Sequence, residues 1–500
     1  MSAPIVERIS YGNLRPPRRP GVLGLGMAAS VCGGIAAIVV VVMLMFAGIL
    51  AALVTLVVLT LVLLPLVIHG RDGHTGYEKI LAATLFRRAD RAGKTKYVSG
   101  VTGQTPDGCT RLPGLLAATE LVSGTDVYGE EFGVLITPAI EHYAIVFQTE
   151  ATGAEMVNQS VTDNEVAHHG GWLAQLSQEA DVVAAAVTVE TAPDPGTRLV
   201  RMMNRHRQDD APEFSGATMD EIAQKYPVAS SSITTRVAVT FNGKPRAGEQ
   251  ARSRADMLDY LARRLPGFRA GLTTTGAGTA VRAMSAADLT DAVRVAYDPS
   301  VAQLVEEERA AGGTGLTWSE AGPAYAREFP EHYSHDGAHS ISWHMKEPPS
   351  GVFYDQVLRD LLKPHGDIDR KRVTLVYRPE PASQAQRIVE KDIRDATTQA
   401  TSRGRPQQVD LTMLDAARKS AKEQATGAGV VRFGMIVTAT VIDEAMLARA
   451  ASTVRMLADS QRIRLRLARY NQAATFAAGL PLGLVLPAHL AVPDWMRDAL

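Results

Sequence analysis

The chain has 500 residues, carries 52 Lys and Arg against 53 Asp and Glu, and is longer than one hydrophobic core normally organises. A formal net charge of −1 gives no support for nucleic-acid binding through a globally basic surface. Its two cysteines, Cys32 in an apolar segment and Cys109 far beyond it, exclude a disulfide framework and suit a cytoplasmic domain.

The apolar N-terminal segment predicts membrane helices. No Asp, Glu, Lys or Arg occurs between Arg19 and Arg71. One bilayer crossing takes about 20 apolar residues, and this run is about twice that length. We therefore predict an N-terminal tail over residues 1–20 and a transmembrane helical hairpin over residues 21–70, with a turn near Phe46-Ala47-Gly48. A secretory signal peptide has an apolar core of only about 7–15 residues, which this run far exceeds.

Basic residues flank both ends of this segment and predict its orientation. Lys and Arg beside a membrane helix favour the cytoplasmic side, and a hairpin returns both of its ends to one side. We therefore expect a multi-pass protein of the cell inner (plasma) membrane with both termini in the cytoplasm. Residues 77–97 then have the pattern of a basic amphipathic helix, either simply solvated or in contact with anionic lipid headgroups. The basic residues are Arg8, Arg15, Arg18 and Arg19 before the segment and Arg71, Lys79, Arg87, Arg88, Arg91, Lys94 and Lys96 after it.

Helix and strand patterns alternate through the rest of the chain. Strands are predicted where apolar and polar side chains alternate, and helices where apolar side chains recur every three or four residues. The predicted strands cover residues 143–147, 180–191, 233–241, 340–345, 371–377, 431–441 and 462–467. The predicted helices cover residues 158–178, 253–265, 285–297, 352–362, 382–400 and 409–425, and another begins near Leu447.

A stretch with Pro and Gly at residues 244–248 divides this region into a first cytoplasmic α+β subdomain, residues 71–245, and a second, residues 246–500. In the second, the order strand–helix–strand, two helices, strand–helix–strand predicts an α/β sandwich with a mixed sheet, for which the ferredoxin-like motif is one candidate. The expected fold class is therefore α+β, a two-helix transmembrane hairpin followed by a mixed-sheet α/β-sandwich soluble region in two subdomains.

The sequence carries no motif for catalysis or nucleotide binding. The glycine-rich loop at residues 273–279 lacks the Lys of a phosphate-binding loop, and no serine lies in a Gly-x-Ser-x-Gly turn. Four histidines fall close together and offer imidazole ligands, but no His-Glu-x-x-His helix or Cys pair accompanies them. They are His332, His335, His339 and His344. We expect His335 and Asp336 to hold a loop by hydrogen bonds and Trp343 to pack in the core, with no enzymatic activity, no cofactor and no metal site.

Short motifs along the chain resemble one protein family. The start, Tyr11 to Pro16 with the glycine-rich residues 21–26, resembles actinobacterial conjugation membrane proteins with a PrgI-like N-terminus. Those proteins are encoded in integrative conjugative elements and belong to type IV secretion machines. Further blocks agree with the family in their order. They are Leu112–Leu116, Val189–Gly196, Ala296–Pro299, Trp318–Pro323, His335-Asp336 with Trp343, Lys371–Val373 with Tyr377–Pro379, and Gln472–Gly483.

The last block resembles the close of the N-terminal domain of the conjugative type IV secretion ATPase, whose nucleotide-binding core would follow it. The resemblance implies a fusion of the small inner-membrane subunit with that domain, and a motor on a separate polypeptide. It implies a structural component that anchors and docks this ATPase for DNA or protein transfer. The implied partners are membrane lipids, the separate ATPase and other secretion-channel subunits. A homo-oligomer is compatible with this function, and no sequence-specific nucleic-acid binding is expected.

Two sets of residues are candidates for docking the ATPase. Arg462, Arg464 and Arg466 form one basic face of the last predicted strand, for which a solvated charged face is the alternative. Gln472 and Phe476 lie on the helix that follows. Two other functions stay open. One is a core membrane subunit of type VII secretion, since some such subunits also carry an N-terminal two-helix hairpin; the other is a membrane-tethered metalloenzyme built on the four histidines.

Overall fold

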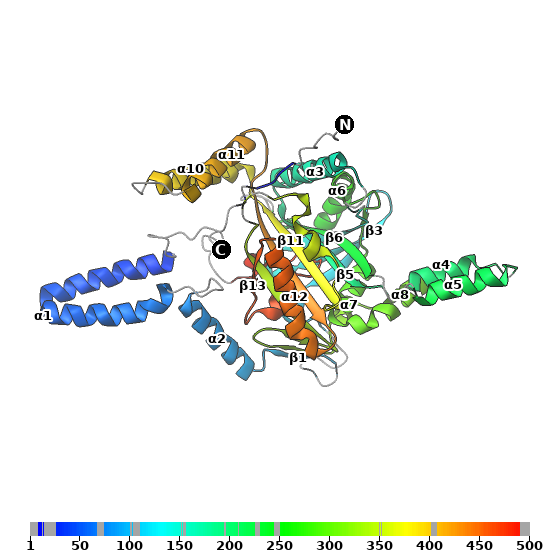
Figure 1. Cartoon of the computed structure of the whole chain (residues 1–500), viewed down its shortest axis with the longest axis horizontal. Coiled ribbons are helices and arrows are strands. Elements are labelled where there is room, and N and C mark those ends of the chain that lie inside the picture. Colours follow the sequence, from blue (N-terminus) through cyan, green and yellow to red (C-terminus); the bar gives the residue numbers. More distant parts are fainter. Residues whose placement is uncertain are drawn as a thin grey trace, which may run out of the picture.

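The computed structural model describes most of the chain as one large sheet with helices on both faces and a long apolar helix that extends from the body (Figure 1). Most of the expected tail over residues 1–20, and the expected boundary at residues 245–246, lie outside the described residues. The described residues are 9–12, 14, 27–67, 75–100, 103, 111–151, 153, 157–194, 197–208, 210–225, 231–244, 251–349, 351, 353–401 and 408–490.

The apolar segment forms one helical element, α1 (Met27–Val67), where we expected two separate helices. Inside it the backbone leaves helical geometry at Gly48, with φ 82° and ψ 175°. Glycine alone adopts these angles readily, so the residue type fixes the position of the bend. Figure 1 draws α1 as two arms that lie alongside each other and meet at their outer end. The predicted break near Gly48 is confirmed, but one residue makes it, so the segment is a single kinked element without a connecting loop.

The sheet has 13 strands, and the pairings among the described strands are all antiparallel. The expected mixed sheet was wrong. Two strands joined through a helix are not direct neighbours here, because a third strand lies between them and pairs antiparallel with both. The order is β1-β8-β9-β10-β12-β11-β5-β6-β4-β3-β2, with β13 beside β10 and β7 beside β4. The strands are β1 (Lys96–Val98), β2 (Glu120–Thr125), β3 (Glu131–Thr137), β4 (His142–Thr149), β5 (Val182–Pro193), β6 (Ser231–Asn242), β7 (Arg282–Ala283), β8 (Tyr325–Glu328), β9 (Tyr333–His335), β10 (Ala338–Glu347), β11 (Arg370–Pro379), β12 (Val431–Val441) and β13 (Arg464–Leu467).

The sheet contains the same four-strand arrangement twice. The spatial order β7-β4-β6-β5 in the first half of the chain recurs as β13-β10-β12-β11 in the second. Helices α3 (Gln159–Gln178) and α6 (Arg254–Thr273) connect strands of the first copy, and α9 (Arg359–Leu362) and α12 (Leu447–Ser460) connect those of the second. Each copy is therefore the β-α-β-β-α-β ferredoxin-like motif, which the sequence suggested for the second half alone.

A helical hairpin is inserted at the same place in both copies. Helices α4 (Thr197–His206) and α5 (Glu213–Lys225) lie between β5 and β6, and α10 (Ala382–Thr401) and α11 (Gln408–Ala425) lie between β11 and β12. In Figure 1 the α4–α5 hairpin is at the opposite end of the long axis from α1, whereas α10 and α11 are on the side nearer α1. The two copies therefore carry two helical hairpins, which extend from different parts of the body.

The two copies join edge to edge through β5 and β11. Their seven paired positions centre on Thr188 opposite Thr374, whose hydroxyl oxygens are 3.1 Å apart in a hydrogen bond. Both threonines are fully buried. Strands from both sides of the expected boundary thus share one continuous sheet, and the division into two subdomains stays a prediction.

Apolar side chains pack on both faces of the sheet. On one face α3 and α6 cover the first copy with a cluster that includes Trp172, and α12 covers the second with a cluster that includes Trp343. On the other face lie α7 (Ala286–Tyr297), α13 (Gln472–Ala478) and the segment that ends at Val485. The remaining helices are α2 (Gly76–Arg91) and α8 (Ala302–Ala311), and short 3-10 turns include η6 (Trp318–Ala321) and η8 (Glu444–Met446).

The second face of the sheet buries charge at its centre. The Glu190 carboxylate accepts hydrogen bonds from Nη1 of Arg236 and Nη1 of Arg370, each at 2.8 Å. These arginines hold the pKa of Glu190 at about 2 although burial opposes ionisation. Arg372, which pairs with Glu190 across β5 and β11, stacks its guanidinium on the ring of Phe476, 4.6 Å from the ring centroid. One buried carboxylate thus lies among three arginines.

Candidate membrane-attachment and docking site

Helix α1 is the one described helix that is long and apolar enough to cross a membrane. Its candidate span, Val31–Pro65, is almost entirely unburied, so the body does not cover its apolar surface. A core helix of a water-soluble protein would be mostly buried, and α1 is not. The large exposed apolar surface is typical of a segment that contacts lipid.

Helix α2 follows α1 and begins with a capping box, in which Thr75 and Glu78 satisfy each other's backbone N–H groups. One side of α2 touches the body, where the Phe86 ring lies 5.4 Å from the Tyr470 ring. The opposite side carries an apolar stripe at helical spacing, whose members are each 45–58% exposed. The stripe consists of Tyr77, Ile80, Leu81 and Leu85.

Three of the four basic residues of α2, Arg87, Arg88 and Arg91, lie towards its C-terminal end, whereas Lys79 lies near its start. Arg88 and Arg91 are in the last turn, where they also complement the helix dipole. Apolar side chains near the end of α1 and arginines one to two turns further on match the change from the acyl region to the headgroup region of a bilayer. The helix dipole explains the arginines at this end of α2, but it does not explain the exposed apolar stripe, which needs a separate cause.

The three candidate docking arginines lie in and just before β13. Arg462, in a left-handed backbone conformation, and Arg464 are exposed, whereas Arg466 is half-buried. Arg464 Nη1 lies 3.4 Å from a Glu347 carboxylate oxygen at a well-exposed position. Among the described strands β13 pairs with β10 alone, so it is an edge of the sheet. Tyr470, which contacts α2, follows β13 closely, so this basic edge and α2 are neighbours.

Gln472 and Phe476, the other candidate docking residues, are buried in the interior. Gln472 holds β10, because its Oε1 accepts from the Ser342 N–H at 2.8 Å and its Nε2 donates to the Ser342 carbonyl. Phe476 is fully buried and packs against the rings of Tyr297 and Tyr333. These two side chains therefore have a structural role in the interior, although Ala473 and Ala474 of the same helix are half-buried.

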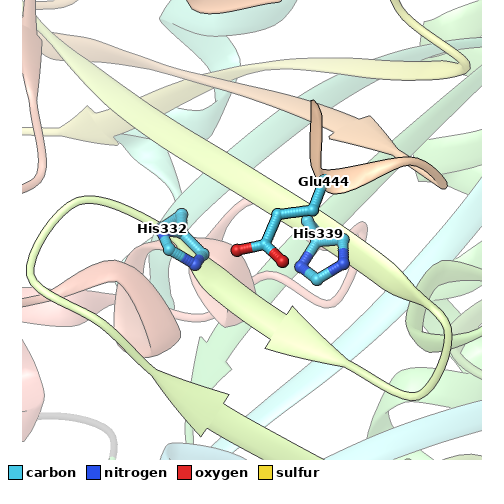
Figure 2. Close-up of side chains that lie close together, drawn as sticks. All are labelled: His332, His339 and Glu444. Carbon is cyan, nitrogen blue, oxygen red and sulfur yellow. The ribbon is translucent and has the colours of Figure 1, made fainter. Parts of the chain in front are cut away.

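The four histidines separate onto the two faces of the sheet. His332 and His339 approach Glu444 of η8, and one potential ligand atom from each of the three lies within 4.8 Å of the others (Figure 2). His335 points to the opposite face, where its Nδ1 bonds the Tyr297 carbonyl and its Nε2 the Ser340 hydroxyl. Complete burial lowers the pKa of His335 to about 3. The sequence suggested His332 and His339 but not Glu444, which lies more than a hundred residues downstream.

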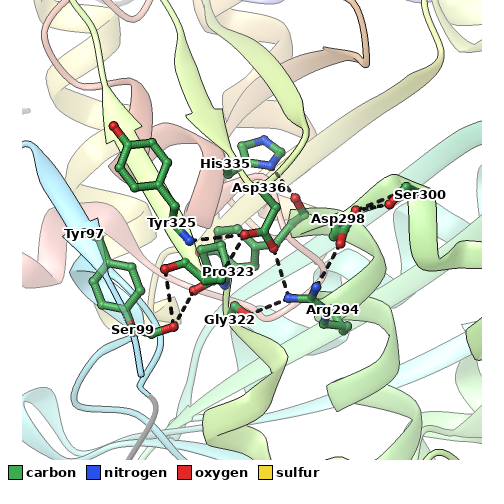
Figure 3. Close-up of polar contacts among 12 residues, drawn as sticks. Tyr97, Ser99, Arg294, Asp298, Ser300, Gly322, Pro323, Tyr325, His335 and Asp336 are labelled. Carbon is green, nitrogen blue, oxygen red and sulfur yellow. Dashed lines mark hydrogen bonds and ion pairs between the residues drawn. The ribbon is translucent and has the colours of Figure 1, made fainter. Parts of the chain in front are cut away.

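His335 and Asp336 hold their loop as predicted. Figure 3 shows the Asp336 carboxylate at the centre of a polar network that joins several elements. Its Oδ1 accepts from the N–H groups of Ala324 and Tyr325, and its Oδ2 accepts from Arg294 at 3.1 Å. Arg294 also donates to Asp298 and to the Gly322 carbonyl. This network positions the β9–β10 hairpin, and Trp343 is buried in the core, as expected.

Comparison with known proteins identifies one matching region. Residues 18–78 match the family model of a domain of unknown function (DUF8461). This region contains α1 and the first residues of α2, so the match covers the long apolar helix and stops short of the sheet. No curated protein matches the chain.

Proposed function

We propose that this protein is a membrane-anchored structural component of a conjugative type IV secretion-like system, and that its body docks a separate ATPase. The observation that carries the anchoring part is the uncovered apolar surface of α1, continued by the exposed stripe of α2. The docking part rests on the family resemblance of the sequence and on the basic edge strand β13.

We propose further that the two arms of α1 cross the bilayer separately. A straight helix of 41 residues would be about 60 Å long, roughly twice the hydrocarbon thickness. Each arm beside Gly48 has about 20 residues, or about 30 Å, which matches one crossing. The bend at Gly48 then lies at the far side, and α2 emerges on the same side as the N-terminus. A signal peptide does not account for an apolar run of this length.

Helix α2 would lie in the interface, with Ile80 and Leu85 in the acyl boundary and Arg87 and Arg88 near anionic headgroups. This position holds the sheet close to the bilayer. A docked partner is confined to the same thin layer, which raises its effective concentration at the machine. The sequence contains no phosphate-binding loop, so in this proposal the energy source is the partner.

The exposed arginines at β13 are the proposed contact for the ATPase. An edge strand offers unpaired backbone groups, and Arg462 and Arg464 add a charged recognition surface. Rim charges of this kind mainly set the association rate and its salt dependence. We therefore expect docking through this surface to weaken as salt rises.

The test has two arms that fail separately. For anchoring, membranes containing the full chain are washed with alkaline carbonate. The protein stays in the pellet if α1 is an integral membrane segment, and its release into the supernatant refutes the anchor.

For docking, the detergent-solubilised chain is co-purified with the conjugative ATPase encoded beside it. Arg462→Glu with Arg464→Glu should reduce recovery, whereas Arg418→Glu, at a similarly exposed position on α11, should not. Absence of binding by the unaltered chain, or equal recovery of both variants, refutes docking at β13.

A further inference from the structure

We propose that His332, His339 and Glu444 form a binding site for a divalent transition-metal ion of the zinc class. The proposal goes beyond the structural role above and does not depend on it. Figure 2 shows the three side chains converging from separate elements. His339 is on the same face of β10 as Ile341 and Trp343, the face that α9 and α12 cover.

Strand pairing brings the three residues together. His339 lies opposite Ser334 in the β9–β10 hairpin, and His332 immediately precedes β9. His339 also lies opposite Val441 in β12, and Glu444 follows Val441 at the start of η8. The Asp443 side chain caps η8 by accepting from the Ala445 N–H, which fixes the backbone beside Glu444. The site therefore joins the edge hairpin to the β12–α12 connection.

Both imidazoles are already oriented for binding. His339 Nδ1 hydrogen bonds with the Ser334 hydroxyl at 2.8 Å, which leaves its Nε2 as the ligand atom. Metal-bound histidines usually have such a partner on the other ring nitrogen. The His332 ring stacks on Phe329, with centroids 4.4 Å apart and planes 16° apart. Neighbouring groups thus restrict the rotation of both rings.

His332 supplies an independent indication of a ligand. Its Nε2 is buried, yet it makes no hydrogen bond to any described residue. A buried polar atom without a partner is costly, and most such atoms in folded proteins are satisfied. A metal ion at this nitrogen satisfies it.

The donor set selects the class of metal. Two imidazoles with one carboxylate suit zinc and its neighbours, whereas calcium and magnesium prefer oxygen ligands alone. Donor atoms bound to one tetrahedral zinc at about 2.0–2.1 Å lie about 3.4 Å apart. The three atoms lie within 4.8 Å of one another, so small side-chain rotations would close the remaining gap, and Glu444 is the exposed member of the three. Three protein ligands leave a fourth position for water or for a donor from a partner.

The test uses the full chain in detergent after removal of metals with a chelator. Zn²⁺ alone is titrated against a competing chelator, and Co²⁺ is added as a spectroscopic probe of the ligand set. We expect one ion per chain, with the visible absorption of tetrahedral cobalt. Ser334→Ala, which removes only the partner of His339, should weaken zinc affinity about 10–100-fold, and Glu444→Gln or His339→Gln should weaken it at least as much.

Matched controls are Glu307→Gln and His206→Gln, which change exposed residues on α8 and α4 and should leave affinity unchanged. Because Glu444 is exposed, Glu444→Gln should fold normally, and unchanged tryptophan fluorescence confirms that it does. Absence of stoichiometric zinc in the unaltered chain overturns the proposal. Equal zinc binding by Glu444→Gln and the control variants overturns it as well, since the metal would then be bound elsewhere.

Discussion

The buried carboxylate of Glu190 allows a quantitative prediction about stability. Burial opposes its ionisation, but the positive charges of Arg370, Arg236 and Arg372 outweigh burial and lower the pKa of Glu190 from 4.5 to about 2. Because the folded-state pKa lies below the unfolded value, the stabilisation is fully present above pH 4.5 and is lost as the pH falls towards 2. This difference corresponds to about 3 kcal/mol of unfolding free energy. Protonation of Glu190 should therefore contribute to acid destabilisation of the sheet over that pH range, alongside protonation of His335.

Glu190→Gln removes the same charge at neutral pH. The variant leaves Arg236, Arg370 and Arg372 buried without a compensating carboxylate, and breaking a buried pair in this way costs about 3–5 kcal/mol. Glu120→Gln is the matched control, because its ion pair with Arg254 is about half exposed on both sides. Exposed pairs contribute about 0–1 kcal/mol, so the control should unfold almost like the unaltered chain.

Urea denaturation of the full chain in detergent, followed by tryptophan fluorescence at pH 7 and pH 4, measures both effects. The unaltered chain should have a lower midpoint at pH 4 than at pH 7. The part of that fall that belongs to Glu190, about 1 kcal/mol, should be missing from Glu190→Gln, whereas the part that belongs to His335 should remain. Arg372→Met added to Glu190→Gln should restore part of the lost stability, because it removes a buried guanidinium whose Nη1 and Nη2 have no hydrogen-bond partner among the described residues. A midpoint for Glu190→Gln equal to that of Glu120→Gln would show that the charge cluster does not stabilise the sheet.

Three further predictions concern single residues. Gly48→Ala should cost about 1–3 kcal/mol at the bend, because φ 82° with ψ 175° is strained for any residue with a side chain. Cysteine labelling of the two ends of α1 from outside the cell should then show a changed topology. An unchanged labelling pattern counts against the bend. Phe476→Ala should destabilise the body by about 3–5 kcal/mol in urea denaturation, whereas Phe214→Ala, at an 83% exposed position, should have little effect; equal midpoints for the two would contradict the interior role of α13. The pKa of His335 is about 3 in the folded state against 6.5 unfolded, so the free energy of unfolding should fall as the pH drops below 6.5. In His335→Asn this free energy should depend less on pH between pH 6.5 and 5, a range above the one in which Glu190 titrates.

Local patterns in the sequence predicted individual elements better than their assembly. The alternation at residues 233–241 and 431–441 correctly indicated β6 and β12, because each side chain reports which face of the sheet it occupies. The pairing of β5 with β11 was not predictable in this way. Thr188 and Thr374 are far apart in sequence, and both strands have apolar neighbours on either face, so nothing local specifies which edges meet.

The same limit explains the docking residues that proved to be buried. Gln472 and Phe476 belong to a short Ala-rich helix, which gives no clear apolar stripe by which to recognise an interior position. Its partners lie far away in the sequence: Phe476 packs on the rings of Tyr297 and Tyr333, and Gln472 is satisfied by the backbone of Ser342. A buried Gln has the same sequence signature as an exposed one, so only the tertiary contacts distinguish a docking helix from a structural one.

For the histidine cluster, in contrast, the sequence contains a turn that predicts which histidines share a face, although their spacing alone does not. Asp336-Gly337 is a typical two-residue hairpin turn, and Asp336 adopts the required positive φ of 46°. This turn fixes the register that places His339 opposite Ser334, and strand alternation then puts His335 on the other face. Counting histidines treats all four as equivalent, whereas the turn separates a pair that can share one ion from a residue that is committed to the core. Only the third ligand, Glu444, depends on a distant strand and therefore required the folded sheet.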